Sequence, residues 1–392
     1  MSLRSLAVSA LSAVSLLTAC GGSNSAPSGP TPALTLQQSA DQTVSNGLAG
    51  VALAHLTVDT TTPALAGLRQ VGSTAKVQAG DAFMIGSTTK AMTAALAGRL
   101  VERGALAWTT TLADALPDLA AGMQPAYRTV TLEQLLNHRG GVPAFTGGDD
   151  IDRIQTYLQH YPGELPTTLP GRERFFAAWL LAQAPAAGVT PGQSFVYSNA
   201  GYALAALMLE ATTGRAFTDL FEQELAQPLG LAVSWTSSNA TFLNRPAGHA
   251  GAKGQLQPLG LDDADIAGWL DVLRASGQGT TLTPDAYATW VRWHLRALRG
   301  EATPLAGGYL QRIQALKAGD YGLGWINAEI DGRPVLFHNG ADRGFSSLVV
   351  IDARGRSASF GITNSEADDG AWVLAVLNDA LLSIERALPP AK

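Results

Sequence analysis

The stretch FMIGSTTKAMTAALAGRLVER, residues 83–103, joins a short apolar segment to a long helical pattern. Residues 88–103 are rich in Ala and Leu at helical spacing, and Gly104 follows as a stop signal, so we predict a helix there. Ser87 and Lys90 lie three positions apart at its start, which brings the lysine amine towards the serine hydroxyl. The positive end of the helix favours negative charge at this point. The pair is therefore a candidate nucleophile and base.

A second pair, Ser73 and Lys76, has the same spacing, so the spacing alone is weak evidence. The residues after Lys76 do not continue as a helix and predict a turn between strands. The sequence around them therefore favours Ser87 over Ser73.

The segments around this helix predict the architecture. We expect strands over residues 49–58, 64–71, 334–338, 346–352 and 357–363. We expect helices over residues 34–46, 131–137, 172–184, 200–213, 217–226, 284–298 and 369–387. Strands at both ends with helices between them indicate an α+β fold: one antiparallel sheet assembled from both termini and flanked by helices, beside an inserted, mostly helical region over roughly residues 105–280.

Composition excludes several classes of function. The chain has 392 residues, 46% of them hydrophobic and 15% charged, which is enough for a sizeable core. The net charge of −6, without a basic run, argues against nucleic acid as a partner. One cysteine excludes an internal disulfide and a cysteine-based zinc cluster, and the six histidines form neither H-E-x-x-H nor H-x-H. We therefore expect no metal site.

The N-terminal segment predicts export. Arg4 precedes a mildly apolar stretch over residues 5–18, which ends in Leu17-Thr18-Ala19-Cys20. This ending resembles the lipobox of bacterial lipoproteins, and the alternative is a plain signal peptide with a chance cysteine. The resemblance implies removal of residues 1–19, a lipid on Cys20 and a periplasmic location at a bacterial membrane (the outer membrane in a Gram-negative host, because Gly21 is not aspartate). Residues 20–33 would then be a flexible tether and 34–392 the globular domain.

A Tyr-x-Asn motif occurs once, as Tyr197-Ser198-Asn199, after a Pro-Gly turn signal and before a predicted helix. A free tyrosine titrates near pH 10, too high for a base at neutral pH. We expect a neighbouring Lys90 ammonium to lower the pKa of Tyr197, so that Tyr197 takes the proton of Ser87 directly or through Lys90. Asn199 either orients Lys90 or holds a substrate amide.

A third element is His338-Asn339-Gly340, where a predicted strand ends and another follows. The same H-x-G pattern at His138 and His249, and a lysine version at residues 317–319, lack that context, and we expect the other histidines to be structural. The backbone N–H of Ala341, paired with that of Ser87, is our candidate oxyanion hole.

These three motifs, in this order, resemble those of the serine β-lactamase and penicillin-binding protein superfamily, in its branch of class C β-lactamases, DD-peptidases and esterases. Other segments resemble the family in the same order: Leu135-Leu136-Asn137-His138, Gly141-Val142-Pro143, Pro228-Leu229-Gly230, Tyr321-Gly322-Leu323-Gly324-Trp325 and Gly344-Phe345-Ser346-Ser347. The resemblance implies a β-lactamase/transpeptidase-like fold, acylation of Ser87 by a carbonyl substrate and hydrolysis of the acyl-enzyme by water. It implies no cofactor.

The third motif departs from the family, because many β-lactamases carry lysine where His338 stands and Thr or Ser where Asn339 stands. A neutral histidine weakens a positive clamp for a substrate carboxylate. The expected substrate is a β-lactam, a D-amino-acid peptide or an ester. One alternative is a carboxylesterase or D-Ala-D-Ala carboxypeptidase with little β-lactam turnover, and another is an inactive lipoprotein that binds cell-wall peptides. No G-x-S-x-G occurs, which argues against a nucleophile-elbow hydrolase.

Overall fold

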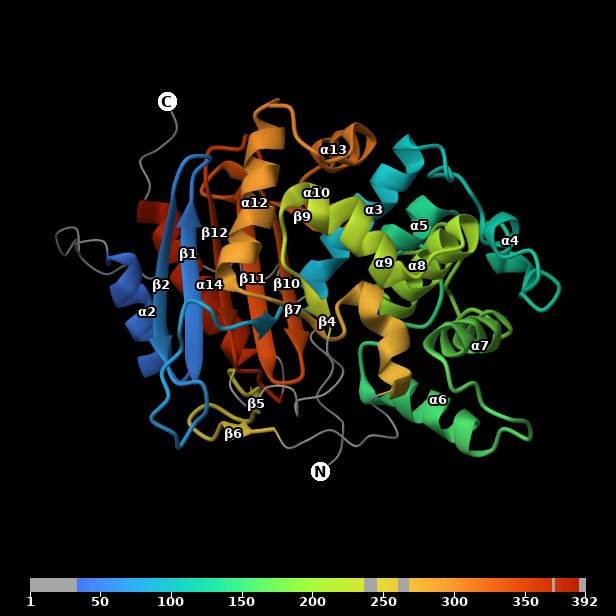
Figure 1. The fold of residues 1–392 in the computed structure, drawn as a ribbon, viewed down its shortest axis with the longest axis horizontal. Coiled ribbons are helices and arrows are strands. Elements are labelled where there is room, and N and C mark those ends of the chain that lie inside the picture. The colour runs from blue at the N-terminus through green and yellow to red at the C-terminus, as the bar shows by residue number, and fades with distance from the viewer. Residues whose placement is uncertain (1–33, 236–244, 260–267, 369–370, 388–392) are drawn as a thin grey trace.

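A seven-stranded antiparallel sheet forms one half of the molecule and a group of helices forms the other (Figure 1). The computed structural model describes residues 34–235, 245–259, 268–368 and 371–387. The strands run across the sheet in the order β2 (Thr61–Gly67), β1 (Gly50–Leu56), β12 (Ala358–Thr363), β11 (Phe345–Asp352), β10 (Arg333–Asp342), β9 (Trp325–Ile330) and β8 (Tyr321–Gly322). Strands from both ends of the chain thus pair in the centre, which confirms the predicted α+β architecture.

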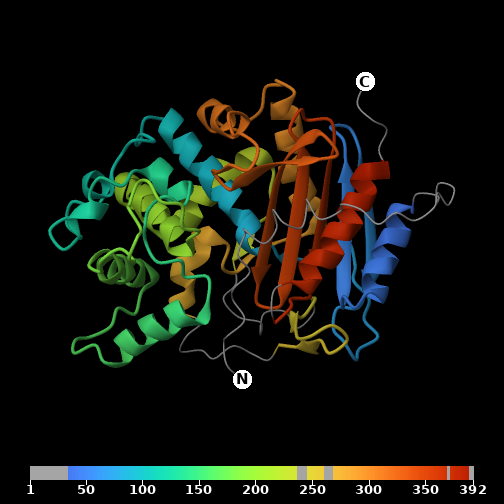
Figure 2. The same cartoon turned by 180° about the vertical axis from the view of Figure 1, so that it is seen from behind.

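Helices cover both faces of this sheet. Helix α12 (Pro284–Leu298) lies on the face towards the viewer in Figure 1, and α2 (Leu36–Ser45) and α14 (Trp372–Ala387) lie on the opposite face in Figure 2. Side chains alternate between the two faces along a strand. Accordingly, Leu53 of β1 packs in the core beneath α14, whereas Leu56 belongs to the core on the α12 side. Burial on both faces explains why every residue of β11 is buried.

The helical half is built around α8 (Asn199–Thr213), in which ten consecutive residues from Ala200 to Leu209 are buried. A helix that is apolar on all sides needs neighbours on all sides. These are α4 (Leu112–Ala115), α5 (Leu132–Leu136), α7 (Leu169–Leu181), α9 (Phe217–Phe221) and the 3-10 helix η5 (Asp271–Ser276), with α6 (Gly148–Gln159) further out. The main connection between the halves is α3 (Thr89–Glu102), which packs on α8 and η5 just after the 3-10 turn η1 (Gly86–Thr88) packs on β10.

Shorter elements complete the fold. A small sheet joins β3 (Phe83–Met84), β7 (Thr280–Leu282) and β4 (Ser234–Trp235), and a hairpin joins β5 (His249–Ala250) to β6 (Gln257–Pro258). The remaining elements are the 3-10 turn η2 (Pro125–Tyr127), the π-helical turn η3 (Glu222–Ala226), α10 (Gln227–Leu229) and α13 (Gly307–Gln314). The inserted region is therefore not purely helical, because β4, β5 and β6 fall within residues 105–280.

Several predicted boundaries are wrong. The predicted helix over residues 88–103 begins as the 3-10 turn η1, and the one over residues 217–226 ends in the π-helical turn η3. Strand β2 lies three residues or more before its prediction, because Thr61 to Pro63 are mostly exposed and lack an apolar signal. Strand β10 runs past residue 338 to Asp342. We did not predict α6 or β9, and the predicted start of the closing helix at residue 369 lies outside the described residues.

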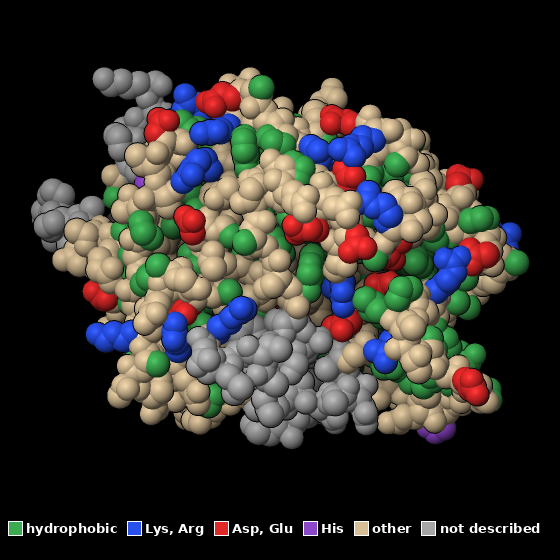
Figure 3. Space-filling view, viewed as in Figure 1, with side chains coloured by type: hydrophobic (Ala, Val, Ile, Leu, Met, Phe, Trp, Pro, Cys, Tyr) green, Lys and Arg blue, Asp and Glu red, His purple; other side chains and the backbone are tan. Residues whose placement is uncertain are grey.

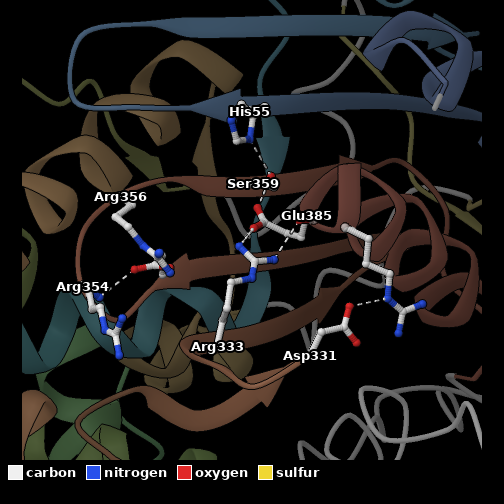
Figure 4. A network of polar contacts seen from close by, with 9 residues as sticks. His55, Asp331, Arg333, Arg354, Arg356, Ser359 and Glu385 are labelled. Atoms are coloured by element: carbon white, nitrogen blue, oxygen red, sulfur yellow. Dashed lines mark hydrogen bonds and ion pairs between the residues drawn. The ribbon is translucent and has the colours of Figure 1, made fainter. Parts of the chain in front are cut away.

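A buried polar network holds α14 against the sheet (Figure 4). Glu385 of α14 accepts a hydrogen bond of 2.6 Å from Ser359 of β12, and its carboxylate lies 3.5 Å from the guanidinium of Arg333 on β10. Ser359 in turn bonds to His55 of β1 at 3.1 Å. The network therefore ties three strands to the C-terminal helix.

The surface carries mixed charge. Lys and Arg side chains alternate with Asp and Glu side chains across the face shown in Figure 3. Within the described parts of the chain, no helix is long and apolar enough to cross a membrane.

Candidate active site

Ser87 lies at the junction between the two halves, in the tight turn η1 between β3 and α3. Gly86 enters this turn at φ +52°, and a Cβ there would lie 2.6 Å from the backbone nitrogen of Ala341. Only glycine combines that backbone conformation with such a close approach. The carbonyl oxygen of Ile85 accepts hydrogen bonds from Thr88 and Ser347, which fixes the turn against β11. The local sequence therefore holds Ser87 beside β10.

Lys90 is completely buried one helical turn further on. Its Nζ lies 2.9 Å from Ser87 Oγ, 2.7 Å from Asn199 Oδ1 and 2.9 Å from the carbonyl oxygen of Ser276. Burial lowers the pKa of Lys90 well below its usual range. A neutral amine donates two hydrogen bonds and accepts one, which matches two oxygen acceptors and one serine hydroxyl. This arrangement suits Lys90 to receive the proton of Ser87.

Tyr197 faces the same serine. Its side chain is 8% exposed, makes a hydrogen bond with Ser87, and its ring centroid lies 4.9 Å from Lys90 Nζ. Burial raises the pKa of Tyr197 above its usual value, and the hydrogen bond with Ser87 opposes this only in part. Our expectation that Lys90 lowers this pKa is wrong, because removing the phenolate from water outweighs its stabilisation by neighbouring groups. Tyr197 is therefore a protonated phenol that can donate a proton.

Asn199 is the first residue of α8, and its neighbour Ser198 caps that helix by accepting a hydrogen bond from the Gly201 N–H. Both ends of the Asn199 amide are engaged. Its Oδ1 accepts from Lys90, and its Nδ2 donates to the carbonyl of Phe145 at 2.8 Å. Of the two roles left open by the sequence, the geometry favours orientation of Lys90.

The end of β10 supplies the other wall of the site. Among the described residues, β9 pairs with β10 only from Arg333 to Phe337. Residues 338–342 of β10 pack beside η1 instead. A Cβ on Gly340 would lie 2.2 Å from the Ile85 carbonyl oxygen and 2.8 Å from the Ser87 nitrogen, so the two backbones touch. Asn339, Gly340 and Ala341 line a pocket together with Ser87. Ser87 and Ala341, whose N–H groups are the predicted oxyanion donors, thus line the same small pocket.

His338 lies behind the pocket and is not one of the described residues that line it. It is fully buried, with its ring centroid 6.3 Å from that of Tyr197 and 5.7 Å from that of Tyr321. Its Nδ1 lies 2.5 Å from the carbonyl oxygen of Asn339. Burial, together with the charge of Lys90, lowers the pKa of His338 to about 3, so the ring is neutral. The predicted role of His338 in binding substrate stays a prediction, and its position favours support of Tyr197.

His138 is a site residue that the sequence analysis assigned only a structural role. Its ring centroid lies 4.1 Å from that of Tyr197, and its Nδ1 accepts a hydrogen bond of 3.0 Å from the Ser198 N–H. It has a left-handed backbone with φ +56°, which non-glycine residues adopt only when their surroundings hold them there. The sequence signal that could have indicated this position is that His138 ends Leu135–His138, a segment that resembles the family. The Ser276 carbonyl carried no sequence signal, because every residue has one.

The competing motifs lie elsewhere. Ser73 donates its hydroxyl to the carbonyl of Gln70, and Lys76 is exposed and forms a β-bridge with Leu68. His249 is buried, where its ring accepts from the Val71 N–H and bonds to the Asn364 carbonyl. Both motifs therefore have local structural roles, as expected.

The space in front of Ser87 is a narrow slot of about 40 Å³. Its described lining includes Thr146, Gln278 and Asp342 in addition to the motif residues, but no Lys or Arg side chain. Asp342 accepts a hydrogen bond of 2.7 Å from the Gly279 N–H. No group of His, Cys, Asp and Glu side chains suited to a metal ion occurs in the described residues. The polar side chains that line the slot are therefore hydroxyls, a phenol, amides and one carboxylate, and the Lys90 amine lies behind Ser87.

This fold and this arrangement of groups define a serine hydrolase of the β-lactamase type. A family model described as Beta-lactamase matches residues 36–381, and the chain belongs to that family. Penicillin-binding protein 4 of Amycolatopsis lactamdurans is 27% identical over 320 residues, which cover 76% of each chain. Unguisins hydrolase ungD of Aspergillus violaceofuscus is 29% identical over 254 residues, or 62% of this chain but only 41% of that protein. Among solved structures, a D-stereospecific amidohydrolase from Streptomyces sp. superposes with a TM-score of 0.66 at 22% identity, covering 91% of this chain and 98% of that one.

Proposed function

We propose that the protein hydrolyses ester or amide substrates without a carboxylate next to the scissile bond, through an acyl-enzyme on Ser87. The observation that carries this proposal is the position of Lys90, whose buried amine contacts Ser87 Oγ while two oxygen atoms orient it. Such an amine is a base already placed at its nucleophile.

In the proposed acylation step, Ser87 Oγ attacks the substrate carbonyl and its proton moves to Lys90. The N–H groups of Ser87 and Ala341 stabilise the oxyanion that forms. As the bond to the leaving group breaks, Tyr197 donates its phenolic proton to that group and recovers a proton from Lys90. In deacylation, a water molecule attacks the acyl carbonyl, passes one proton to the Tyr197 and Lys90 pair, and Ser87 takes a proton back as the acid is released.

The preference for uncharged substrates follows from the charges around the slot. The described lining offers an acidic side chain, Asp342, which pairs with Arg343 at 4.0 Å, and no Lys or Arg of its own, and the nearby His338 is neutral. Lys90 has its three contacts within the protein. A substrate carboxylate buried here would lack a partner for its charge, which is costly. Penicillins and C-terminal D-Ala-D-Ala peptides carry such a carboxylate, so the esterase alternative gains support over efficient β-lactam turnover.

The test compares a chromogenic cephalosporin with p-nitrophenyl acetate, using wild type, Ser87→Ala and Ser73→Ala. We expect ester turnover that falls by about 10³-fold or more in Ser87→Ala and stays unchanged in Ser73→Ala, because removing a nucleophile removes its covalent route. We expect a much lower kcat/KM for the cephalosporin.

Three other results would contradict the proposed substrate class, the proposed nucleophile or the enzymatic activity itself. Fast cephalosporin turnover would make the protein a β-lactamase despite its third motif. Loss of activity in Ser73→Ala alone would show that the nucleophile is Ser73 and not Ser87. No turnover of either substrate, together with no labelling of Ser87 by an acylating probe, would favour an inactive peptide-binding protein.

A further inference from the structure

A second cavity, of about 540 Å³, lies directly beside the slot that holds Ser87. Four residues line both spaces, namely Phe145, Ile151, Leu270 and Leu273. The cavity therefore adjoins the active-site slot, with these four residues as their common wall. Its size falls within the range of sites that bind small organic molecules, about 300–1,000 Å³.

The walls of this cavity are apolar. They come from α6, from α7, from residues 269–273 at the start of η5 and from the loops on either side of α6. The lining residues are Phe145, Ile151, Ile154, Gln155, Leu158, Gln159, Leu165, Phe176, Trp269, Leu270, Val272 and Leu273. The described lining includes two glutamines and no charged side chain. Figure 3 shows hydrophobic side chains gathered over α6 and α7, and Leu165 is 36% exposed. Apolar surface left open to water in a concave site is typical of ligand binding.

One wall residue is connected to the catalytic groups. Phe145 presents its side chain to both spaces, while its carbonyl accepts the hydrogen bond from Asn199, the residue that orients Lys90. Phe145 has a left-handed backbone with φ +50°, and its N–H donates to Asp150 at 2.7 Å. The surroundings thus hold Phe145 in a conformation that non-glycine residues rarely adopt. The apolar wall and the orientation of the base depend on the same backbone.

The slot itself is too small for more than the reacting carbonyl and its nearest atoms. A substituent on that carbonyl must therefore leave the slot, and the wide apolar cavity adjoins it. We propose that this cavity is a substrate subsite that receives a large apolar group, an acyl chain of medium length or an aromatic ring, attached to the carbonyl attacked by Ser87. The proposal rests on the proposed function and specifies its substrate class.

The experiment measures kcat/KM for two series of esters, with the full chain. One series consists of p-nitrophenyl esters from acetate to octanoate, and the other of acetate esters of alcohols of the same lengths, followed by proton release. Burial of each methylene group improves transfer from water by about four-fold at most. We expect kcat/KM to rise at least about ten-fold from the shortest to the longest member of one series.

Matched variants locate the effect. Gln155 lines the cavity, and its neighbour Thr156 is exposed on the same helix and does not line it. In Gln155→Trp the indole fills the cavity, so the ratio of long-chain to short-chain kcat/KM should fall to about one to two. Thr156→Trp should keep the wild-type ratio. Leu158→Asp, which places a charge in the cavity, should lower the ratio as well if Gln155→Trp does not fold.

The outcomes separate this inference from the proposed function. Acetate turnover that depends on Ser87, with no gain along either series, would overturn the subsite and leave the proposed function standing. A gain that Gln155→Trp and Thr156→Trp reduce equally would also overturn it. A gain in the alcohol series instead of the acyl series would support the subsite and assign it to the leaving group. No Ser87-dependent turnover at all would overturn the proposed function itself.

Discussion

Lys90 has no access to water, and its amine contacts three oxygen atoms. Because burial lowers its pKa, the amine loses its proton at a lower pH than a free lysine, which titrates near pH 10.4. Activity requires the neutral amine, so it is lost as pH falls through the lowered pKa of Lys90 and is retained above that pKa.

Lys90→Arg tests this base. Arginine stays protonated in proteins, so it cannot accept the serine proton. We expect kcat to fall by about 10²–10⁴-fold, the usual contribution of a general base. The measurement is the pH profile of kcat/KM for wild type and variant, with circular dichroism as the control for folding. A wild-type profile that rises only near pH 10 would contradict the role of a neutral Lys90.

His338→Lys tests the effect of the missing positive charge, because many β-lactamases carry lysine where this protein has His338. The neutral, buried His338 packs against the rings of Tyr197 and Tyr321, and a positive charge on Lys90 contributes to its low pKa. A lysine at this position adds positive charge behind the slot, so we expect a lower KM for a penicillin and little change for an uncharged ester. An unchanged KM for the penicillin in a variant with wild-type thermal stability would count against this explanation.

At the scale of elements, the site depends on the approach of β10 to η1. Gly340 lies at the contact, where an added Cβ would meet the Ile85 carbonyl, the Ser347 hydroxyl and the Ser87 nitrogen at 2.2–2.8 Å. The clash is with backbone as well as side chain, so it is not relieved by a rotamer change. The two elements must therefore separate if this position carries a side chain.

Gly340→Ala should consequently reduce stability and activity together. We expect the free energy of unfolding to fall by about 1–3 kcal/mol, as for other overpacked positions, and kcat to fall because both oxyanion donors move. The measurements are urea denaturation and ester kinetics. Gly80→Ala is the matched control, since nothing lies within 4 Å of a Cβ there. Equal behaviour of the two variants would show that the contact has no effect.

At the scale of the whole molecule, Glu366 joins the β5–β6 hairpin to the large sheet. Its carboxylate accepts a hydrogen bond of 2.7 Å from the Gly344 N–H, and its own N–H donates to the His249 carbonyl. Burial, with a smaller contribution from nearby Asp342 and Asp368, raises the pKa of Glu366 to about 8. The folded protein therefore keeps this group protonated at a pH where the unfolded chain, with a pKa of about 4.3, has lost the proton.

Glu366→Gln removes this titration and keeps an acceptor for Gly344. A raised acid pKa gives stability that is complete below the unfolded pKa and is lost as pH rises towards the folded pKa. We expect wild type to lose about 1.4 kcal/mol of unfolding free energy per pH unit relative to Glu366→Gln between about pH 5 and 8, and nothing further above. The measurement is urea denaturation at several pH values. Parallel curves over this range would contradict the assignment.

The predicted lipid anchor also concerns the whole molecule. Cys20 and the tether over residues 20–33 lie outside the described residues, and the anchor stays a prediction based on the lipobox resemblance. We propose that the mature protein is held by a lipid at the periplasmic face of a bacterial membrane. Labelling with a fatty-acid analogue should modify wild type and leave Cys20→Ser unlabelled, whereas equal labelling would leave only a plain signal peptide.

The sequence by itself determined the α+β architecture and the Ser87 and Lys90 pair. Helical periodicity, apolar strands at both ends and a three-residue spacing at a helix start are local patterns, so they can be recognised without a structure. The same patterns failed at β2, which lacks an apolar signal, and at α6, which we did not recognise.

Only the tertiary structure decided the protonation of Tyr197, the place of His138 behind it, and the apolar cavity beside Ser87. The pKa of Tyr197 depends on how much water its surroundings exclude. The prediction from sequence included the charge of Lys90 but not the burial of the tyrosine. The cavity needs α6 and α7 to meet residues 269–273, which follow them by about a hundred residues in the chain. Desolvation and contacts between distant segments exist only once the chain is packed, and no local pattern of residues encodes them.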